Sequence, residues 1–488
     1  MLWLLLLSLL VSSEAQAQVD QVHLSITTDP SKWGVDCVAH VEGPIQIEFC
    51  TTGSCSTAFN VSSPVFIAEI GFLHQVLMEG LQLNTEYTYR IATSTGLWTD
   101  DFHFITGPYE RDFVRRGDSG GVGGAVVAVF ADLGLYNGLS TSRLLNESIR
   151  HTFDYALHVG DISYDLFSNA SQVGNDYMNL MGPLMQSKPL MVAAGNHESG
   201  DNFQSYTQRF RGTEKLAGAA SGSGSNHYYS FDEGLIHFVV INVEVYESEA
   251  AAAAGPLPFT ASQQLAWLEA DLQRANEPAQ RESVPWIVLL GHRPWYFVPP
   301  ANFSDIDSLA CASGVDLYVC GHVHNYQRWV PMRAPSAGSA FVPADVDASC
   351  VSSDSHTYTD PLYMATIVTG SAGCHSPLPR VACPVMQMGS KIALKNSLAK
   401  CSAAYGFGHL QAVNSTHLYW EFVQSHKAAS VLPDAPGGDT WDTGAVRAYL
   451  KDLGGYEALG QSEERGERGG GMSEEAFVAE VLATPVQE

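Results

Sequence analysis

Residues 156–165, Ala-Leu-His-Val-Gly-Asp-Ile-Ser-Tyr-Asp, contain an apolar run that ends at Gly160 and is followed by Asp161 and Tyr164. An apolar run that stops at a glycine is typical of a buried β-strand. In open α/β sheets, ligands bind at the carboxyl ends of such strands. We therefore expect Asp161 and Tyr164 to lie at a sheet edge, where a carboxylate and a phenol can together bind a hard metal ion.

Four other apolar runs also end in polar side chains that can bind metal ions. A single Asp in such a place is commonly a helix cap, and a single His commonly belongs to the core or the surface. Five such strand ends in chain order, most of them flanked by glycine, instead predict that the side chains meet at one site. The four further ends carry Asp132 after Val126–Phe130, Asn196 and His197 after Leu190–Ala194, His292 after Trp286–Leu290, and His322 and His324 after Leu317–Cys320.

The types of these side chains indicate two metal ions. Apart from His197, two Asp, one Tyr, one Asn and three His are too many for one tetrahedral ion but suit two ions that share a carboxylate. Two ions about 3.5–4 Å apart are the usual arrangement for hydrolysis of phosphate esters. A phenol must lose its proton to bind, which a trivalent ion promotes, whereas imidazole and amide suit a softer divalent ion. The side chains therefore predict one trivalent and one divalent ion.

The remaining sequence indicates two domains. Residues 20–107 contain short alternating runs between Gly, Asn, Asp and Ser, which is the pattern of a small antiparallel β-sandwich. A glycine-rich connection, residues 117–124, follows it. Strands and helices then alternate over residues 121–425, which predicts an α/β or α/β/β/α layered core. Within this core, residues 212–225 and 247–257 are rich in Gly, Ser and Ala, and we expect loops or insertions there.

Several features predict a secreted or vacuolar protein. Of the 488 residues, residues 1–17 contain an apolar run and a small-residue cleavage site, which predicts a signal peptide, although no Lys or Arg precedes the run. The formal net charge of −27 disfavours nucleic acid and anionic membranes as partners, and no membrane anchor is evident. Residues 428–488 are Gly-rich and acidic, and we expect a largely disordered tail. Sequons for N-glycosylation lie at Asn60, Asn146, Asn169, Asn302 and Asn414.

The nine cysteines fit an oxidising compartment. Cys50 and Cys55 bracket a short Thr-Thr-Gly-Ser turn and could pair with each other, although the sequence does not fix the disulfide pairing. Because the number of cysteines is odd, at least one thiol is unpaired or intermolecular. Cys320, which lies in an apolar run, is our candidate for a buried free thiol.

The five strand ends resemble the signature blocks of the purple acid phosphatases, whose tyrosine separates them from other dinuclear phosphoesterases. The likeness extends to Tyr229–Asp232 and Tyr405–Gly408 and covers roughly residues 20–425. It implies an α/β/β/α metallophosphoesterase sandwich, with residues 358–425 as its C-terminal β region, preceded by a fibronectin III-like antiparallel β-sandwich. The blocks are Asp-Leu-Gly (132–134), Gly-Asp-Ile-Ser-Tyr (160–164), Gly-Asn-His-Glu (195–198), Leu-Leu-Gly-His (289–292) and Gly-His-Val-His (321–324).

The resemblance also implies cofactors and their ligands. Each chain would hold one Fe(III) and one divalent ion, which is Zn, Mn or Fe(II) in the family. Asp161 would bridge the two ions. Asp132, Tyr164 and His324 would complete the Fe(III) site, and Asn196, His292 and His322 would complete the divalent site.

The implied function is that of a secreted acid phosphatase, which hydrolyses phosphate monoesters by attack of a metal-bound hydroxide. His197 would not bind metal; it would contact the phosphate or protonate the leaving group, and Glu198 would orient His197. Asn196 would also contact the substrate. Partners would thus be phosphate esters. The sequence is compatible with a homodimer but does not fix the oligomeric state.

One departure from the family leaves alternatives open. The family often has one or two further histidines shortly after the fourth block, whereas Arg293–Asn302 contains none. Outer contacts to the substrate must therefore differ, and Arg293 is a candidate substrate-binding residue that could supply positive charge. A phosphodiesterase, a nucleotide pyrophosphatase or a phytase on the same scaffold is thus an alternative. A non-catalytic secreted binding protein is a more remote one, because all the expected ligands are present.

Overall fold

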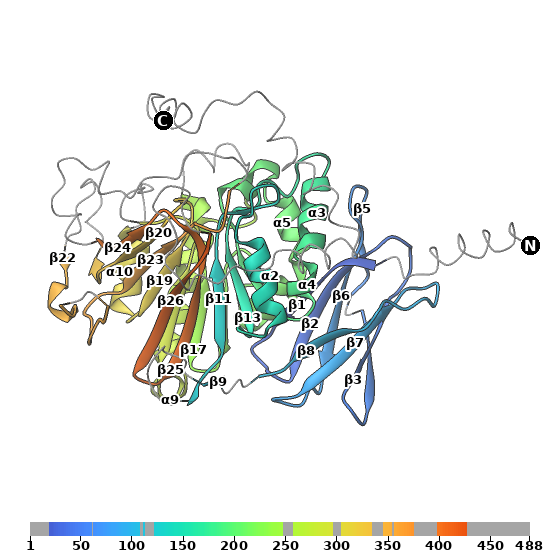
Figure 1. Ribbon diagram of the computed structural model, residues 1–488, viewed down its shortest axis with the longest axis horizontal. Coiled ribbons are helices and arrows are strands. Elements are labelled where there is room, and N and C mark those ends of the chain that lie inside the picture. Colours follow the sequence, from blue (N-terminus) through green and yellow to red (C-terminus); the bar gives the residue numbers. More distant parts are fainter. Residues whose placement is uncertain are drawn as a thin grey trace, which may run out of the picture.

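The computed structural model describes residues 19–60, 62–107, 111–112, 122–246, 257–295, 304–333, 345–353, 356–374 and 398–426. Figure 1 shows a strand-rich N-terminal part beside a larger part in which helices flank β-sheets. The predicted signal peptide, the predicted glycine-rich connection up to Gly121, the segment 247–256, Asn302 and the predicted acidic tail lie outside the described residues.

The N-terminal part consists of two four-stranded antiparallel sheets, as the alternating pattern predicted. Their inner faces share one core, in which the rings of Trp33 and Phe104 stack with centroids 4.9 Å apart. A disulfide joins Cys50 to Cys55 and confirms that pairing. In spatial order the sheets are β1 (Val19–Ile26), β2 (Lys32–Ala39), β6 (Gly71–Glu79) and β5 (Val65–Ile67), and β4 (Cys55–Phe59), β3 (Gln46–Cys50), β7 (Glu86–Ala92) and β8 (Phe102–Ile105).

The larger part is built on two mixed sheets. In the five-stranded sheet the first three strands are parallel and the last two antiparallel. Its order is β15 (Leu190–Ala193), β13 (Tyr155–Val159), β11 (Val126–Phe130), β25 (Tyr405–Asn414) and β26 (His417–His426). The seven-stranded sheet has the order β16 (Tyr229–Glu233), β17 (Ile236–Val240), β18 (Trp286–Leu290), β19 (Leu317–Cys320), β23 (Ala365–Thr369), β20 (Tyr326–Trp329) and β24 (Leu398–Ser402).

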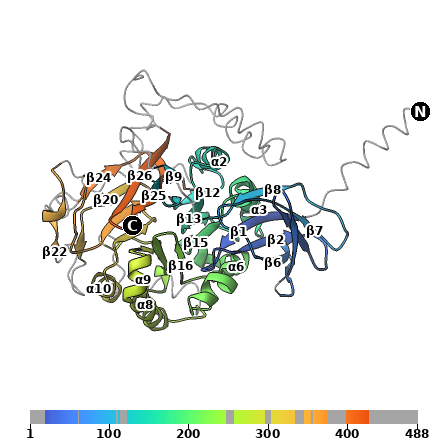
Figure 2. The same cartoon turned by 90° about the horizontal axis from the view of Figure 1, so that it is seen from below.

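The inner parallel strands are apolar on both faces because both faces are covered. Between the sheets, Leu157 and Val129 lie in the same buried cluster as Val288 and Phe238. The outer face of the five-stranded sheet packs against α2 (Thr141–Ile149), α3 (Gln172–Leu180) and α4 (Gly182–Met185). The outer face of the seven-stranded sheet packs against α8 (Ala261–Ala275) and α10 (Ser304–Ala312). Figure 2 shows α8 and α10 on the opposite side of the sheets from α2. The layers are therefore α/β/β/α, as the sequence pattern predicted, and Cys320 is a buried free thiol, also as predicted.

Local capping signals explain where α8 (Ala261–Ala275) begins. Thr260 accepts a hydrogen bond from the amide N of Gln263 at 3.2 Å, and the Gln263 side chain accepts one from the Thr260 amide at 2.8 Å.

No helix among the described residues is long and apolar enough to cross a membrane. The α-helices are α2 (Thr141–Ile149), α3 (Gln172–Leu180), α4 (Gly182–Met185), α5 (Gln204–Arg209), α6 (Arg211–Thr213), α8 (Ala261–Ala275), α9 (Pro278–Ser283) and α10 (Ser304–Ala312).

Shorter elements complete the larger part. Three two-stranded ladders pair β9 (Arg111–Asp112) with β10 (Val122–Gly123), β12 (Leu133–Gly134) with β14 (Ile162–Ser163), and β21 (Met332–Arg333) with β22 (Asp345–Val346). The 3₁₀-helices are η1 (Asn196–Asp201), η3 (Val243–Tyr246) and η4 (Ala348–Cys350), and η2 (Glu214–Gly218) is a π-helix.

The expectation of a loop over residues 212–225 is wrong for its first half. There α6 continues into η2, a π-helical segment. Ala217 is fully buried, and a Cβ atom at Gly34 of the N-terminal sandwich would lie 2.3 Å from Cδ1 of Leu216. The helical part contains Glu214, Lys215, Leu216 and Ala217, which are good helix formers, and packing against another part of the chain adds to that preference.

A buried histidine ties the β16–β17 hairpin to α8. His237 bonds through Nδ1 to Asp232 at 2.6 Å and through Nε2 to Asp271 at 3.0 Å. Burial acts to lower the pKa of His237, but the hydrogen bonds and charges of the two carboxylates outweigh it and raise the pKa to about 9. Since the folded pKa lies above the unfolded value, His237 stabilises the fold fully below about pH 6.5 and loses this contribution as the pH rises to about 9.

We expect His237→Gln to lower the free energy of unfolding by roughly 2–3 kcal/mol at pH 6, and by clearly less at pH 9.5. Urea unfolding of both proteins at the two pH values measures this difference. His40→Gln is the control, because His40 forms a half-exposed pair with Asp20 at 3.0 Å that should contribute little at either pH. A loss that is the same at pH 6 and pH 9.5 would contradict the assignment.

Candidate metal centre

The candidate ligands follow strands of both central sheets. Asp132 follows β11, Asp161 and Tyr164 follow β13, and Asn196 begins η1 directly after β15. His292 follows β18, and His322 and His324 follow β19. The ladder of β12 with β14 pairs Leu133 with Ile162 and so joins the loops that carry the two aspartates. Parallel strands present their carboxyl ends at one edge, which explains why segments far apart in sequence meet here.

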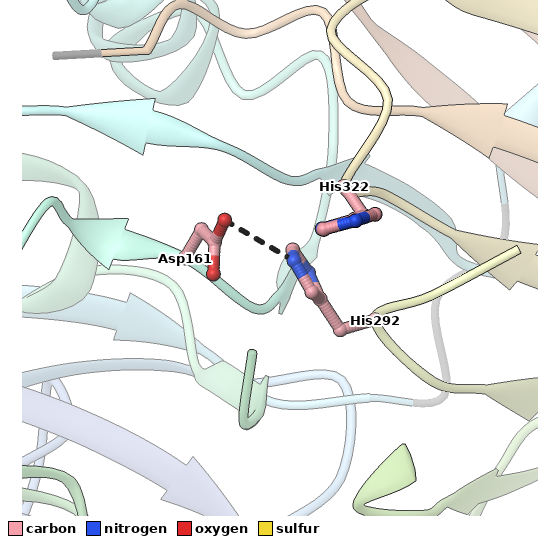
Figure 3. Close-up of side chains that lie close together, drawn as sticks. All are labelled: Asp161, His292 and His322. Carbon is pink, nitrogen blue, oxygen red and sulfur yellow. Dashed lines mark ion pairs between the residues drawn. The ribbon is translucent and has the colours of Figure 1, made fainter. Parts of the chain in front are cut away.

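Asp161, His292 and His322 form one candidate metal-binding group, that is, a group whose ligand atoms lie close enough together to hold an ion (Figure 3). Nε2 of His292 lies 3.2 Å from Oδ2 of Asp161. The side-chain oxygen of Asn196 lies 3.1 Å from Nε2 of His292 and 2.9 Å from Nδ1 of His322. Nδ1 of His292 lies 3.0 Å from the carbonyl oxygen of Val159, a contact that fixes the ring and directs Nε2 toward the group.

A second group consists of Asp132, Asp161 and His324. Nε2 of His324 lies 3.2 Å from Oδ1 of Asp132. The phenol of Tyr164 donates to the same Oδ1 at 3.0 Å and lies 2.8 Å from Nε2 of His324. The backbone amide of His322 donates to the other carboxylate oxygen of Asp132 at 2.8 Å. All seven predicted ligands are thus brought together, and Asp161 belongs to both groups.

The donor atoms in these groups fit two metal ions. Each group combines a carboxylate with imidazole, and the first adds an amide oxygen while the second adds a phenol. The carboxylates create a strongly negative potential. Burial acts to lower the pKa of His292, but Asp161 outweighs it and raises the pKa to about 10. Asp132 likewise overcomes burial and raises the pKa of His324 to about 11. A potential that favours imidazolium also favours metal cations.

Glycines leave the space in which the ligands lie. A Cβ atom at Gly195 would lie 2.4 Å from Oδ1 of Asp161, and one at Gly370 would lie 2.7 Å from Oδ2 of Asp132. Asp161 and His322 themselves have positive φ values of 55° and 66°, a conformation that costs energy in residues other than glycine. The surrounding packing therefore holds the ligands in place, as is common at functional sites.

His197 lies beside the two groups without belonging to either. Its ring meets the Tyr164 ring edge-on with centroids 4.4 Å apart, and its Nε2 lies 3.9 Å from Oδ2 of Asp161. Nδ1 is 2.6 Å from Oδ1 of Asp165. The side chain is 31% exposed, so a molecule in solvent can reach it.

Glu198 has a different partner from the one expected. Instead of orienting His197, its buried carboxylate accepts hydrogen bonds from the amides of Asp161, Ile162 and Gly195 at 3.0, 2.8 and 2.7 Å. It therefore joins the loop after β13 to the loop after β15. The carboxylate that contacts His197 is that of Asp165. Sequence analysis missed Asp165, although it directly follows Tyr164.

Arg293 also has a partner that sequence analysis missed. Its Nε donates to both carboxylate oxygens of Glu244 at 2.9 Å, and its Nη1 lies 3.1 Å from Nε2 of His322. Arg293 therefore borders the first group. Glu244 lies in η3 just beyond β17, another strand of the same sheet, and its position after an apolar run was the available signal.

Comparisons with known proteins agree with this fold. Residues 125–326 match the family of calcineurin-like phosphoesterases, and residues 363–432 match the family described as iron/zinc purple acid phosphatase-like protein C. The chain is 29% identical to acid phosphatase type 7 of Danio rerio, over 78% of this chain and 83% of that protein. It is 28% identical to acid phosphatase type 7 of Homo sapiens, over 86% of this chain and 90% of that protein. Purple acid phosphatase 21 of Arabidopsis thaliana is 29% identical, over 66% of this chain and 68% of that protein.

Among solved structures, purple acid phosphatase PPD1 from yellow lupin (Lupinus luteus) seeds matches with a TM-score of 0.58 and 18% sequence identity. The match covers 84% of this chain and 72% of that one, and at this identity it supports the fold alone. With the two family matches and the named relatives, it leads to the conclusion that this chain is similar to the purple acid phosphatases and to other calcineurin-like phosphoesterases.

Proposed function

We propose that the protein is an acid phosphatase that hydrolyses phosphate monoesters at a centre of two different metal ions. The observation that carries this proposal is the pair of metal-binding groups that share Asp161. Asp132, Tyr164 and His324 would hold Fe(III) together with Asp161. Asn196, His292 and His322 would hold a divalent ion, Zn, Mn or Fe(II), on the other side of Asp161.

The two ions, when bound, would offset the charge of the phosphate and make hydroxide available at acid pH. The protein's own groups would orient the substrate and move the proton. Nε2 of His197 faces the Asp161 side of the site and would protonate the oxygen of the leaving group. Asp165 holds Nδ1 of the same ring, so that His197 keeps its orientation. Arg293, whose Nη1 lies 3.1 Å from Nε2 of His322, would contact the phosphate.

Tyr164→Phe should abolish the visible absorption band expected of a phenolate bound to Fe(III), because the ring would lose its only ligand atom. The measurement is a visible spectrum of both proteins, with iron and zinc quantified by elemental analysis. Tyr136→Phe is the control, since Tyr136 is exposed and should not affect the band. A band that survives in Tyr164→Phe would refute the phenolate ligand. A colourless wild-type protein with two equivalents of Zn or Mn would refute Fe(III) and leave the dinuclear site intact.

We further propose the domain organisation and location that the sequence predicted. Residues 20–107 would be a fibronectin III-like domain, supported by its two packed antiparallel sheets, and residues 121–425 the phosphatase domain. Secretion would place glycans on the accessible sequons. Asn169 and Asn414 are exposed, and Asn146 is half-buried in α2. Asn60 is half-buried with Nδ2 only 2.7 Å from Nδ1 of His74, so a glycan there would require that contact to break.

A further inference from the structure

The Arg293 guanidinium is held on one side by a buried carboxylate and touches a metal-binding histidine with another nitrogen. Nε donates to both oxygens of Glu244 at 2.9 Å, and Nη1 lies 3.1 Å from Nε2 of His322. The Glu244 side chain is 0% exposed, and the Arg293 side chain is 13% exposed. The pair is therefore almost completely enclosed at the border of the metal-binding group.

The carboxylate is itself fixed by hydrogen bonds that lead into α8. The amide of Glu244 donates to the side-chain oxygen of Asn242 at 2.9 Å. The amide of Asn242 in turn donates to the side chain of Gln264, a fully buried residue of α8, also at 2.9 Å. Because the backbone is anchored at Asn242 and at Glu244, the carboxylate can set the direction of the Arg293 side chain.

A buried charge pair is a weak source of stability, since desolvation offsets most of the attraction. Its presence beside a metal-binding group therefore points to another role. Within the part of the chain that the structure describes, the contacts of Arg293 use Nε and Nη1. The N–H groups on Nη2 remain for a ligand, and a guanidinium binds phosphate oxygens with well-defined geometry.

We propose that Glu244 is a positioning residue, which directs Arg293 toward the substrate phosphate and thereby favours phosphate monoesters over diesters. This inference rests on the proposed phosphatase function. A monoester presents three terminal oxygens, and its charge lies between −1 and −2 around its second pKa of about 6. A diester presents two terminal oxygens and a single charge. An additional cationic donor therefore helps the monoester more.

The test compares kcat/KM for p-nitrophenyl phosphate and bis(p-nitrophenyl) phosphate in the wild-type protein, Arg293→Gln, Glu244→Gln and the double variant. We expect Arg293→Gln to lower the monoester value roughly 10- to 100-fold, as for one lost hydrogen bond to a charged group, and the diester value by a few-fold at most. Glu244→Gln should likewise lower the ratio of the monoester kcat/KM to the diester kcat/KM. The double variant should resemble Arg293→Gln, because Glu244 acts through Arg293.

Two further measurements separate positioning from structural damage. Metal content should stay at the wild-type value, and the affinity for inorganic phosphate, measured by calorimetry, should fall about tenfold in Arg293→Gln. Arg281→Gln is the matched control, because Arg281 pairs with Asp316 at 3.2 Å. Asp316 precedes β19, whereas His322 follows β19, so this pair lies at the end of the strand away from the candidate site. It should change neither the ratio nor phosphate binding. If Glu244→Gln folds poorly, Glu244→Asp, which keeps the charge but shortens the arm, replaces it with the same expected direction.

The outcomes distinguish this inference from the function on which it rests. If the wild-type protein hydrolyses phosphate esters and Arg293→Gln keeps its metals, an unchanged monoester-to-diester ratio overturns the inference. A further loss when Glu244→Gln is added to Arg293→Gln overturns the positioning role. If the metal-loaded wild-type protein hydrolyses neither ester, the proposed function fails, and phosphate binding by calorimetry still tests Arg293.

Discussion

Asp161→Asn should remove both metal ions and lower phosphatase activity by on the order of a thousandfold or more. The physical reason is that Asp161 belongs to both candidate metal-binding groups among the described residues. Asparagine has the same shape but neither the charge nor the second anionic oxygen that a bridging ligand needs. Elemental analysis after dialysis, together with the rate of p-nitrophenyl phosphate hydrolysis, measures the two effects.

Two comparisons make this prediction specific. Asp316→Asn changes a carboxylate that precedes β19 and accepts a hydrogen bond from the Ile287 amide at 2.8 Å, so it should retain both metals. His322→Asn changes one group only and should lose mainly one equivalent of metal. Retention of two equivalents in Asp161→Asn would show that Asp161 does not bridge the ions.

His197→Ala should lower the rate on an alkyl phosphate by about 10²–10⁴-fold while both metal ions remain bound. His197 lies outside both metal-binding groups but has Nε2 3.9 Å from Oδ2 of Asp161. An alkoxide is a poor leaving group and needs a proton, whereas p-nitrophenolate leaves readily without one. The loss on p-nitrophenyl phosphate should therefore be much smaller.

The rates of the two substrates, measured on the same metal-loaded preparations, test this role. Asp165→Asn should also lower the rate on the alkyl phosphate relative to p-nitrophenyl phosphate, but by a smaller factor. The reason is that Asp165 holds Nδ1 of His197 at 2.6 Å and does not itself donate the proton to the leaving group. An equal loss on both substrates would indicate that His197 binds the phosphate rather than protonating the leaving group. Loss of metal from His197→Ala would show a structural role instead.

The positions of the ligands could be predicted because the information is local. Each candidate follows an apolar run at its carboxyl end, and the predicted bounds of β11 and β18 agree with the structure. Parallel strands must present those ends at a common edge. The layered α/β/β/α core also follows from local alternation, since strands buried on both faces and amphipathic helices can be recognised one segment at a time.

The missed features all depend on contacts between distant segments. The role of Asp165 depends on the contact of its carboxylate with His197. The role of Glu244 depends on the hydrogen bond that it accepts from Arg293. The sequence predicts that Glu198 orients its neighbour His197, whereas in the fold the amide of Asp161 donates to the Glu198 carboxylate at 3.0 Å. Such pairings depend on side-chain directions in three dimensions, which spacing along the chain does not specify.

The prediction of a loop over residues 212–225 gave too much weight to Gly and Ser. The segment that contains Leu216 and Ala217 has good helix formers, and it packs against the N-terminal sandwich at Gly34. The sequence thus specified the chemistry of this protein, the metal-binding side chains and the strands that deliver them, because these are properties of short segments. Tertiary packing specified how those side chains are shared, oriented and enclosed, because burial and hydrogen bonding join residues that the chain separates by many positions.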